Sequence, residues 1–469
     1  MSGWRIGLLV GGLVVALVGG VAAGTQLAGP SAEGVSPPDT ASTTTDESTT
    51  NETSTATPAS DGATSSSSAG GAECALPAGE PFIEGPSVEL AEIGTSNGAR
   101  VMGALYPLPD DSGDPWSQWG QGVALNEGRF VSALGDHIGP DGNSYIYEYD
   151  SGTGVLQMVG DILSYAEHQP GSWGYGKVHA QMVEGSCGEV YLASYWGTRT
   201  DLVFGGSYSG DYLFRLDPAS RTITELGVPV DSHGIPSMAG FAPLHLVYGE
   251  AVDPFDRPDE DKEGRFFAYD YREERVVFEG PTIQRLGFRN ILVDPQGRAY
   301  YSNGVGELDR FDPASNTVTH HTATLPGDWL RASTAPAPDG RVFGVTEDPS
   351  VFFVMDASGE IDALGPARGY TTSMALDPDG SRFFYIPDAH GGAWASGAPL
   401  ISVDTATGEE TVVAELNPLA EQALGIRLGG TYDIAVAPEG DTVYIGLNGG
   451  SLGSEDVFGE VALLVVELP

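Results

Sequence analysis

Three histidines, His179, His233 and His390, are the side chains in this sequence best suited to chemistry. Imidazole nitrogens are common ligands of divalent transition metals. If the fold brings the three rings together, they can hold a divalent metal that polarises a carbonyl group or stabilises an enolate, which is lyase or hydrolase chemistry. The alternative is structural, with each imidazole forming a hydrogen bond to a neighbouring part of the fold.

Two arginines, Arg289 and Arg331, suggest an anchor for an anion. A guanidinium group pairs with a carboxylate or sulfate through two parallel hydrogen bonds. These cations run against the charge of the whole chain, in which 21 Lys and Arg residues face 65 Asp and Glu residues. An ion pair between structural units explains the arginines equally well.

The net charge of −44 also limits the class of partner. Such a surface repels phosphate backbones, which argues against binding to nucleic acid. Only two lysines occur, Lys177 and Lys262, so almost all the cations are arginines.

From about residue 80 the chain repeats one template, in which two apolar strands flank a turn rich in Asp, Pro and Gly. Copies begin at residues 290, 332, 371 and 431, with the sequences NILVDPQGRAYYS, ASTAPAPDGRVFGVT, TTSMALDPDGSRFFYIP and TYDIAVAPEGDTVYIGLN. The turn glycines Gly188, Gly297, Gly340, Gly380 and Gly440 are 109, 43, 40 and 60 residues apart, and a degenerate copy from residue 233 divides the first gap. A third strand and a second turn follow each hairpin, which makes four strands per unit. Four-stranded units with a period of 40–50 residues indicate propeller blades.

The repeats predict an all-β fold, a seven-bladed β-propeller closed by an N-terminal strand. The first blade is expected at about 99–165, and the others begin near 176, 233, 288, 330, 370 and 430. The last unit lacks an outer strand, which PSVELAEI (86–93) can supply. Residues 82–469 resemble the seven-bladed propellers of the broad YVTN and WD-repeat-like type, on the repeated D-P-x-G and D-x-(A/S/T)-(S/T/G) turns. That resemblance implies an architecture and almost nothing about function.

The geometry of a blade predicts where the candidate residues lie. Because consecutive strands are antiparallel, the start of each inner strand and each loop between the second and third strands share one face. Nine residues before the turn glycines lie His179, Phe288, Arg331, Thr371 and Thr431, and His233 opens the third blade. Long loops at 196–211, 253–264, 388–399 and 448–459 reach the same face. The ligand-binding cup expected there contains His179, His233, Arg289, Arg331, His390, Trp196, Trp394 and Tyr432.

The N-terminal region predicts export. Residues 6–23 are uninterrupted apolar or small residues after Arg5, so segment 1–30 is read as a signal sequence or membrane anchor. Residues 31–81 are rich in Ser, Thr, Pro and Gly, which is typical of a disordered linker. We expect the protein on the extracellular face of the cell membrane, or secreted if the leader is cleaved. The only cysteines, Cys74 and Cys187, then predict one disulfide.

Three functions remain open on the sequence. The first is a tethered, monomeric propeller that binds a small molecule or a saccharide-like ligand at one channel mouth. The second is the metal-assisted lyase or hydrolase based on His179, His233 and His390. The third is a protein-interaction scaffold, which would present a large apolar patch in place of a polar cup.

Overall fold

A computed structural model of the chain describes Cys74 and residues 76–110, 117–197, 208–252, 264–282, 291–454 and 456–469. All of these residues belong to the compact unit formed by residues 68–469. The segment predicted as signal or anchor, nearly all of the predicted linker, and Arg289 lie outside the described residues.

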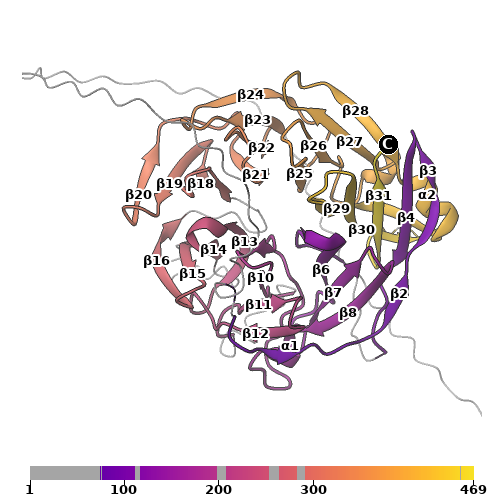
Figure 1. The fold of residues 1–469 in the computed structure, drawn as a ribbon, viewed down its shortest axis with the longest axis horizontal. Coiled ribbons are helices and arrows are strands. Elements are labelled where there is room, and N and C mark those ends of the chain that lie inside the picture. Colours follow the sequence, from indigo (N-terminus) through magenta and orange to yellow (C-terminus); the bar gives the residue numbers. More distant parts are fainter. Residues whose placement is uncertain are drawn as a thin grey trace, which may run out of the picture. The chain divides into compact units, whose positions relative to one another are not determined.

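Seven antiparallel sheets stand around one axis in the described part of the chain, as Figure 1 shows. This arrangement confirms the predicted all-β fold with seven blades. From the axis outward, the first three blades contain β5 Val123–Leu125, β6 Arg129–Gly135, β7 Ser144–Asp150 and β8 Val155–Asp161; β9 Val183–Glu184, β10 Val190–Ala193, β11 Leu213–Asp217 and β12 Thr222–Glu225; and β13 Gly234–Phe241, β14 Leu246–Val252, β15 Gly264–Asp270 and β16 Arg275–Thr282.

The next three blades follow the same pattern. They contain β17 Ile291–Val293, β18 Ala299–Gly304, β19 Glu307–Asp312 and β20 Thr317–His321; β21 Trp329–Ser333, β22 Val342–Glu347, β23 Val351–Met355 and β24 Ile361–Pro366; and β25 Met374–Leu376, β26 Arg382–Tyr385, β27 Pro399–Asp404 and β28 Glu410–Glu415. The seventh blade begins with β29 Ile426–Val436, β30 Thr442–Ser451 and β31 Glu460–Glu467.

The N-terminal segment completes three neighbouring blades. Strand β4 (Ala99–Leu105) pairs with β31, and β3 (Ala91–Ser96) pairs with β4 at the outer edge of the seventh blade. Strands β2 (Ser87–Glu89) and β1 (Glu80–Pro81) extend the first and second blades, on β8 and β12. One stretch of about 25 residues thus ties the ends of the ring together and covers three blade edges.

The closing strand differs from the predicted one. Closure by an N-terminal strand is confirmed, but β4 fills the fourth position of the last blade and the run 86–93 contributes only to outer strands. The first blade consequently begins at Val123 and not near residue 99. The reason lies in burial, because β4 carries Val101 and Ala104 into the core, whereas Glu89 and Glu92 of the predicted strand are exposed. Apolar side chains are required beside β31, whose central six residues are all buried.

Neighbouring blades pack face to face, so their strands are apolar on both sides. One core cluster joins Phe384 of the sixth blade with Ile445, Leu464 and Val101 of the seventh. Short continuous apolar runs such as VALLVV in β31 are the sequence signature of such doubly buried strands.

Short helical segments connect some of the strands. They are η1 Asn126–Gly128, α1 Ile162–Tyr165, η2 Ala242–Leu244, η3 Ala393–Ser396 and α2 Asn417–Ala423. A membrane crossing needs a longer and more apolar helix than any that the described residues form.

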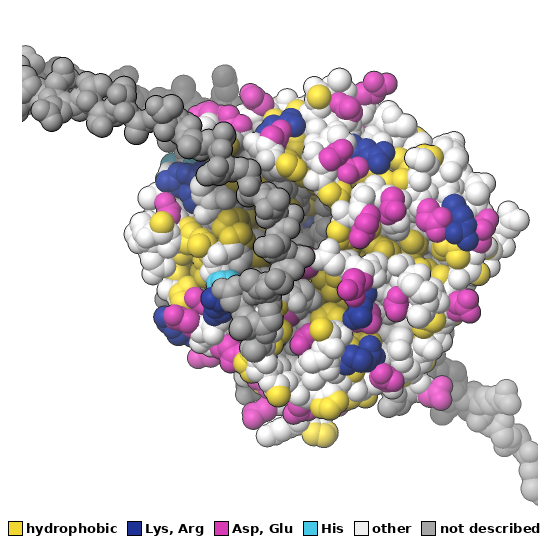
Figure 2. Space-filling model, in the orientation of Figure 1, with side chains coloured by type: hydrophobic (Ala, Val, Ile, Leu, Met, Phe, Trp, Pro, Cys, Tyr) yellow, Lys and Arg dark blue, Asp and Glu magenta, His cyan; other side chains and the backbone are white. Residues whose placement is uncertain are grey.

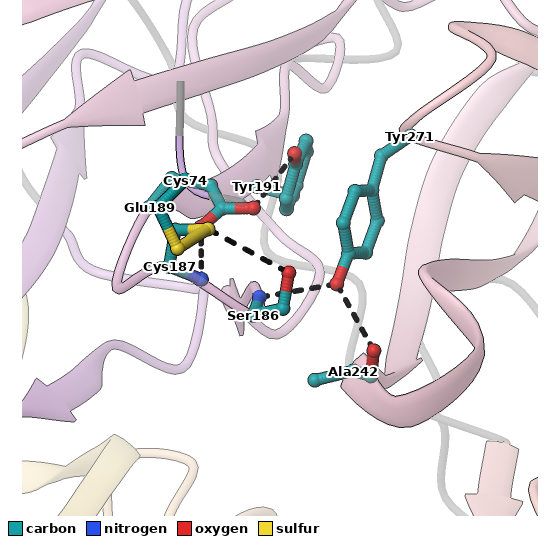
Figure 3. Close-up of a disulfide and its surroundings, with 7 residues drawn as sticks. All are labelled: Cys74, Ser186, Cys187, Glu189, Tyr191, Ala242 and Tyr271. Atoms are coloured by element: carbon teal, nitrogen blue, oxygen red, sulfur yellow. Dashed lines mark hydrogen bonds between the residues drawn. A yellow bond between two sulfur atoms is a disulfide. The ribbon is translucent and has the colours of Figure 1, made fainter. Parts of the chain in front are cut away.

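The predicted disulfide between Cys74 and Cys187 is present, as Figure 3 shows. Cys187 lies in the turn between β9 and β10, and its backbone N–H donates to Glu189 Oε2 at 2.8 Å. The backbone N–H of Ser186 donates to the hydroxyl of Tyr271, at 3.1 Å, which links this turn to the third blade. Cys74 lies six residues before β1 begins. The disulfide therefore attaches the N-terminal segment to the turn between β9 and β10.

Acidic side chains are spread around the face shown in Figure 2 and do not gather in one patch. Several arginines of the described chain pair with them, for example Arg100 with Glu92 and Glu467, both at 2.8 Å, and Arg382 with Asp377 at 2.9 Å. The two pairs of Arg100 are exposed, and exposed pairs contribute little to stability.

Candidate functional site at the loop face of the channel

The loop face is the end of the channel where the inner strands begin and the loops between second and third strands lie; the turn face is the opposite end. Trp119 lies four residues before β5, at the loop face. Its ring centroid is 4.9 Å from that of Tyr432 on β29 and 5.8 Å from those of His390 and Phe458, which come from two of these loops. Residues more than 300 positions apart therefore meet at one mouth.

Four of the sequence-predicted residues belong to this group, which we call the mouth cluster. His390 Nδ1 shares a hydrogen bond with the hydroxyl of Tyr432. The guanidinium carbon of Arg331 lies 5.9 Å from the ring centroid of Tyr432, and its Nε donates to the hydroxyl of Tyr370 at 2.9 Å. Trp196 belongs to the cluster because it contacts Lys177, whose Nζ lies 5.8 Å from the centroid of the Trp196 ring.

The structure places the other predicted residues in local or structural contacts. His179 is buried, and its Nδ1 donates to the carbonyl oxygen of Pro236 in the next blade at 3.0 Å. His233 Nδ1 donates to the carbonyl oxygen of Asp231 in its own turn at 2.7 Å. Trp394 is 40% exposed and packs under the guanidinium of Arg427, 4.6 Å from its ring centroid.

A metal centre made of the three histidines is not formed. Within the described ranges, no group of three or more His, Cys, Asp or Glu side chains is arranged to hold a metal ion. The Nδ1 atoms of His179 and His233 are each engaged by a different backbone carbonyl group. For His179 the structural explanation fits, because its hydrogen bond joins the second blade to the third.

Sequence reasoning missed several members of the mouth cluster: Trp119, Lys177, Tyr370, Phe458 and His137, whose ring centroid lies 5.6 Å from that of Trp119. The most informative of them is Lys177, which is 9% exposed and whose Nζ lies 4.6 Å from the ring centroid of Trp119. Two signals were available in the sequence, since Lys177 is one of only two lysines and lies two residues before His179 on the same inner segment.

The mouth cluster shifts the pKa values of its titratable groups. Burial, and then the charge of Lys177, lowers the pKa of His137 to about 3. Partial burial and the charges of Arg331 and Lys177 also lower the pKa of His390. Burial lowers the pKa of Lys177 itself to about 7. Both imidazoles are therefore neutral at pH 7, and the positive charge of the cluster comes from Arg331 and from the protonated fraction of Lys177.

Lys177 differs from most cations of the described chain, because no carboxylate among the described residues pairs with it. Its neighbours are the indole rings of Trp119 and Trp196, and burial alone shifts its pKa. A desolvated cation on aromatic faces is a favourable site for an anion with a flat or ring-shaped body, which gains from both charge and stacking.

The channel itself contains a cavity of about 430 Å³ on the turn-face side of the mouth cluster. All seven inner strands line it, from Gln121 and Gln181 near the middle of the channel to Ala335, Leu376 and Val436 beside the turns. Its wall is mainly apolar, and Glu184 is the one ionisable side chain among the lining residues. Burial and the charge of Glu189 raise the pKa of Glu184. Nothing in the sequence predicted this cavity.

No family model matches the sequence, and no curated protein matches it. The chain is a seven-bladed β-propeller. Its strand order establishes this and confirms the predicted resemblance to YVTN and WD-repeat-like propellers at the level of architecture.

Solved structures similar to this propeller have low sequence identity. A virginiamycin B lyase from Staphylococcus aureus has 9% identity and a TM-score of 0.49, covering 79% of this chain and 100% of its own. A streptogramin B lyase has 10% identity and a TM-score of 0.48, with 80% and 100% covered. The WD40 repeats of RRP9 have 12% identity and a TM-score of 0.49, with 81% and 100% covered. Nothing about the ligand or activity of this propeller follows from these likenesses.

Proposed function

We propose that this protein is an exported, membrane-tethered propeller that binds a small anion at the mouth cluster, the anion having a flat or saccharide-like body. The observation that carries the proposal is the position of Lys177: a buried lysine without a carboxylate partner among the described residues, in a chain of net charge −44. Burying a cation without an opposite charge costs stability, and a bound anion removes that cost.

The arrangement of the mouth cluster supports this ligand class. Trp119, His390 and Phe458 retain exposed surface, whereas Lys177 and Arg331 are buried, at 9% and 1% exposure. An anion that stacks on the aromatic rings would lie close to two positive charges. Hydrogen bonds to charged groups are stronger than neutral ones, contributing about 1.5–3 kcal/mol each.

Fluorescence titration of the full chain with matched pairs of ligands tests the proposal. Benzoate and glucuronate are the anions, and benzyl alcohol and glucose are their neutral counterparts. We expect saturable quenching of tryptophan fluorescence by at least one anion, with the neutral counterpart binding at least tenfold more weakly, about 1.4 kcal/mol. Equal affinity for an anion and its counterpart, or no saturable binding of either anion, would overturn the proposal.

A pair of variants locates the site. Lys177→Met is expected to lower the affinity for the anion at least tenfold, because it removes a positive charge from the mouth cluster. Glu184→Gln, in the channel wall, is the matched control and is expected to leave the affinity unchanged. The reverse result would move the binding site to the channel cavity.

Export and tethering rest on different observations. The apolar segment at residues 6–23 supports a membrane attachment, and the disulfide between Cys74 and Cys187 is compatible with an oxidising compartment. Protease added to intact cells is expected to degrade the propeller, and the protein is expected in the membrane fraction as a monomer. Protection from external protease, with recovery in the cytosol, would contradict this part of the proposal.

A further inference from the structure

We propose that Lys177 forms an imine with ligands that carry a carbonyl group and a carboxylate at opposite ends of a flat body, the class of carboxylated aromatic aldehydes. The inference rests on the proposed function, because it uses the same mouth cluster, and it adds a covalent step to binding. The amine and carbonyl condense with loss of one water molecule, so that no oxidant, reductant or other reactant is needed.

The surroundings of Lys177 are those of a reactive amine. Its Nζ lies 4.6 Å from the ring centroid of Trp119 and 5.8 Å from that of Trp196. The backbone is fixed by two hydrogen bonds to Tyr195, at 3.1 Å from the Lys177 N–H and at 2.7 Å to its carbonyl oxygen. A lysine in a salt bridge would be held in its charged form, but no described carboxylate pairs with this one.

The neutral amine is the nucleophile in imine formation, and the desolvated site favours it. An ordinary lysine with a pKa near 10.4 is neutral in well under roughly 0.1% of molecules at pH 7. With its pKa lowered to about 7 by burial, Lys177 is neutral in about half of them. Its lone pair attacks the carbonyl carbon, and the carbonyl oxygen then leaves as water with two protons, which forms the C=N bond.

Arg331 supplies the attraction for the carboxylate. Its guanidinium carbon lies 5.2 Å from the ring centroid of Tyr370 and 5.9 Å from that of Tyr432. Tyr432 contacts Trp119, which in turn contacts Lys177. The two cations thus neighbour the two members of one aromatic pair, Lys177 beside Trp119 and Arg331 beside Tyr432. A ligand with its carbonyl group and its carboxylate at opposite ends of a flat body matches this order.

The chain offers an unusually clean test, because Lys177 and Lys262 are its only lysines. The full chain is incubated at pH 7 with 4-carboxybenzaldehyde and sodium cyanoborohydride, which reduces an imine to a stable amine. We expect one adduct by intact mass spectrometry, mapped by peptide analysis to Lys177. Its formation is expected to be at least tenfold faster than labelling of Lys262 or the α-amino group, and to rise with pH through a midpoint near 7. Benzaldehyde, which lacks the carboxylate, is expected to react at least tenfold more slowly.

Three variants separate chemistry from folding. Lys177→Arg keeps the positive charge and is expected to retain benzoate binding while losing the adduct. Lys177→Met is expected to lose both, and Lys262→Arg to keep both. Labelling of Lys262 at the same rate as Lys177, or a pH midpoint near 10, would overturn the inference.

The same experiment distinguishes the two proposals. If benzoate binds in fluorescence titration but 4-carboxybenzaldehyde leaves no adduct at Lys177, the imine is wrong and the anion-binding function stands. If neither binding nor labelling occurs, both are wrong.

Discussion

The mouth cluster and the channel cavity share two inner strands, β21 and β29, but differ in the kind of side chain that they contain. Tyr432 and Val436 both lie on β29, and Arg331 precedes Ala335 by four residues. At the loop face these strands carry large aromatic and cationic side chains that contact one another. Toward the turn face they carry small or aliphatic ones, which leave about 430 Å³ unfilled. In this propeller, the cavity and the gathering of aromatic and cationic side chains therefore lie at different ends of the same channel.

Electrostatics separates the two regions further. The pKa values of three groups are lowered at the loop face, those of His137, Lys177 and His390, and burial is the leading cause for each. The wall of the cavity has one ionisable group, Glu184. Groups with perturbed pKa values concentrate at functional sites, so the loop face is the better candidate.

Truncating an aromatic residue at the loop face is expected to have the largest effect on stability. Tyr432 is 3% exposed and contacts Trp119, His390 and Arg331. Tyr432→Ala should lower the free energy of unfolding by about 3 kcal/mol, measured by chemical denaturation. Leu376 is partly buried in the cavity wall, so Leu376→Ala should lower the free energy of unfolding by only about 1 kcal/mol. Equal losses would mean that the two regions are packed equally well.

The second-largest expected effect is a pH dependence of stability that comes from Lys177 in the mouth cluster and not from Glu184 in the cavity wall. Between pH 7 and 9.5 an unfolded lysine, with a pKa near 10.4, holds a proton that the folded Lys177 has released. The unfolded state thus binds more protons, and the free energy of unfolding should rise with pH by up to about 1.4 kcal/mol per unit. Lys177→Met should remove this rise, whereas Glu184→Gln should retain it. Parallel pH profiles for the native chain and Lys177→Met would contradict the lowered pKa.

Placing a larger side chain in the channel cavity is expected to have the smallest effect on the free energy of unfolding. Ala335 is exposed and lines the cavity, so Ala335→Leu should change the free energy of unfolding by less than about 0.5 kcal/mol. The matched control is Ala332→Leu on β21, where the side chain is 1% exposed in a packed core and the added volume should cost about 1–3 kcal/mol. A large decrease in the free energy of unfolding for Ala335→Leu would show that the cavity cannot hold the larger side chain without strain.

Much of the fold was predictable because it repeats. The turn glycine takes positive φ values between 77° and 87° at Gly188, Gly297, Gly340 and Gly440, so the motif marks the same local geometry in different blades. The identity of the closing strand was not predictable from alternation alone, because β3 and β4 both alternate. Burial against β31 decided between them.

The candidate site was predicted only in part. The strand-direction rule placed His390, Arg331, Trp196 and Tyr432 at one end of the ring, and the structure connects these four through shared neighbours. The strand-direction rule did not predict that His179 bonds to the carbonyl group of Pro236. It also did not predict that Lys177, two residues earlier, lies over the ring of Trp119. Neighbouring positions on a strand point in different directions, and packing against the next blade decides which of them meets the channel mouth.

The sequence by itself determined the strand content, the number of blades, the disulfide and the acidic surface, because each follows from composition or from short repeated patterns. Only the tertiary structure decided which charges are buried together. A pKa depends on desolvation and on neighbours that are hundreds of residues away, such as Lys177, Arg331 and His390 around one mouth. Ring closure brings these residues together, and no local pattern encodes their distances.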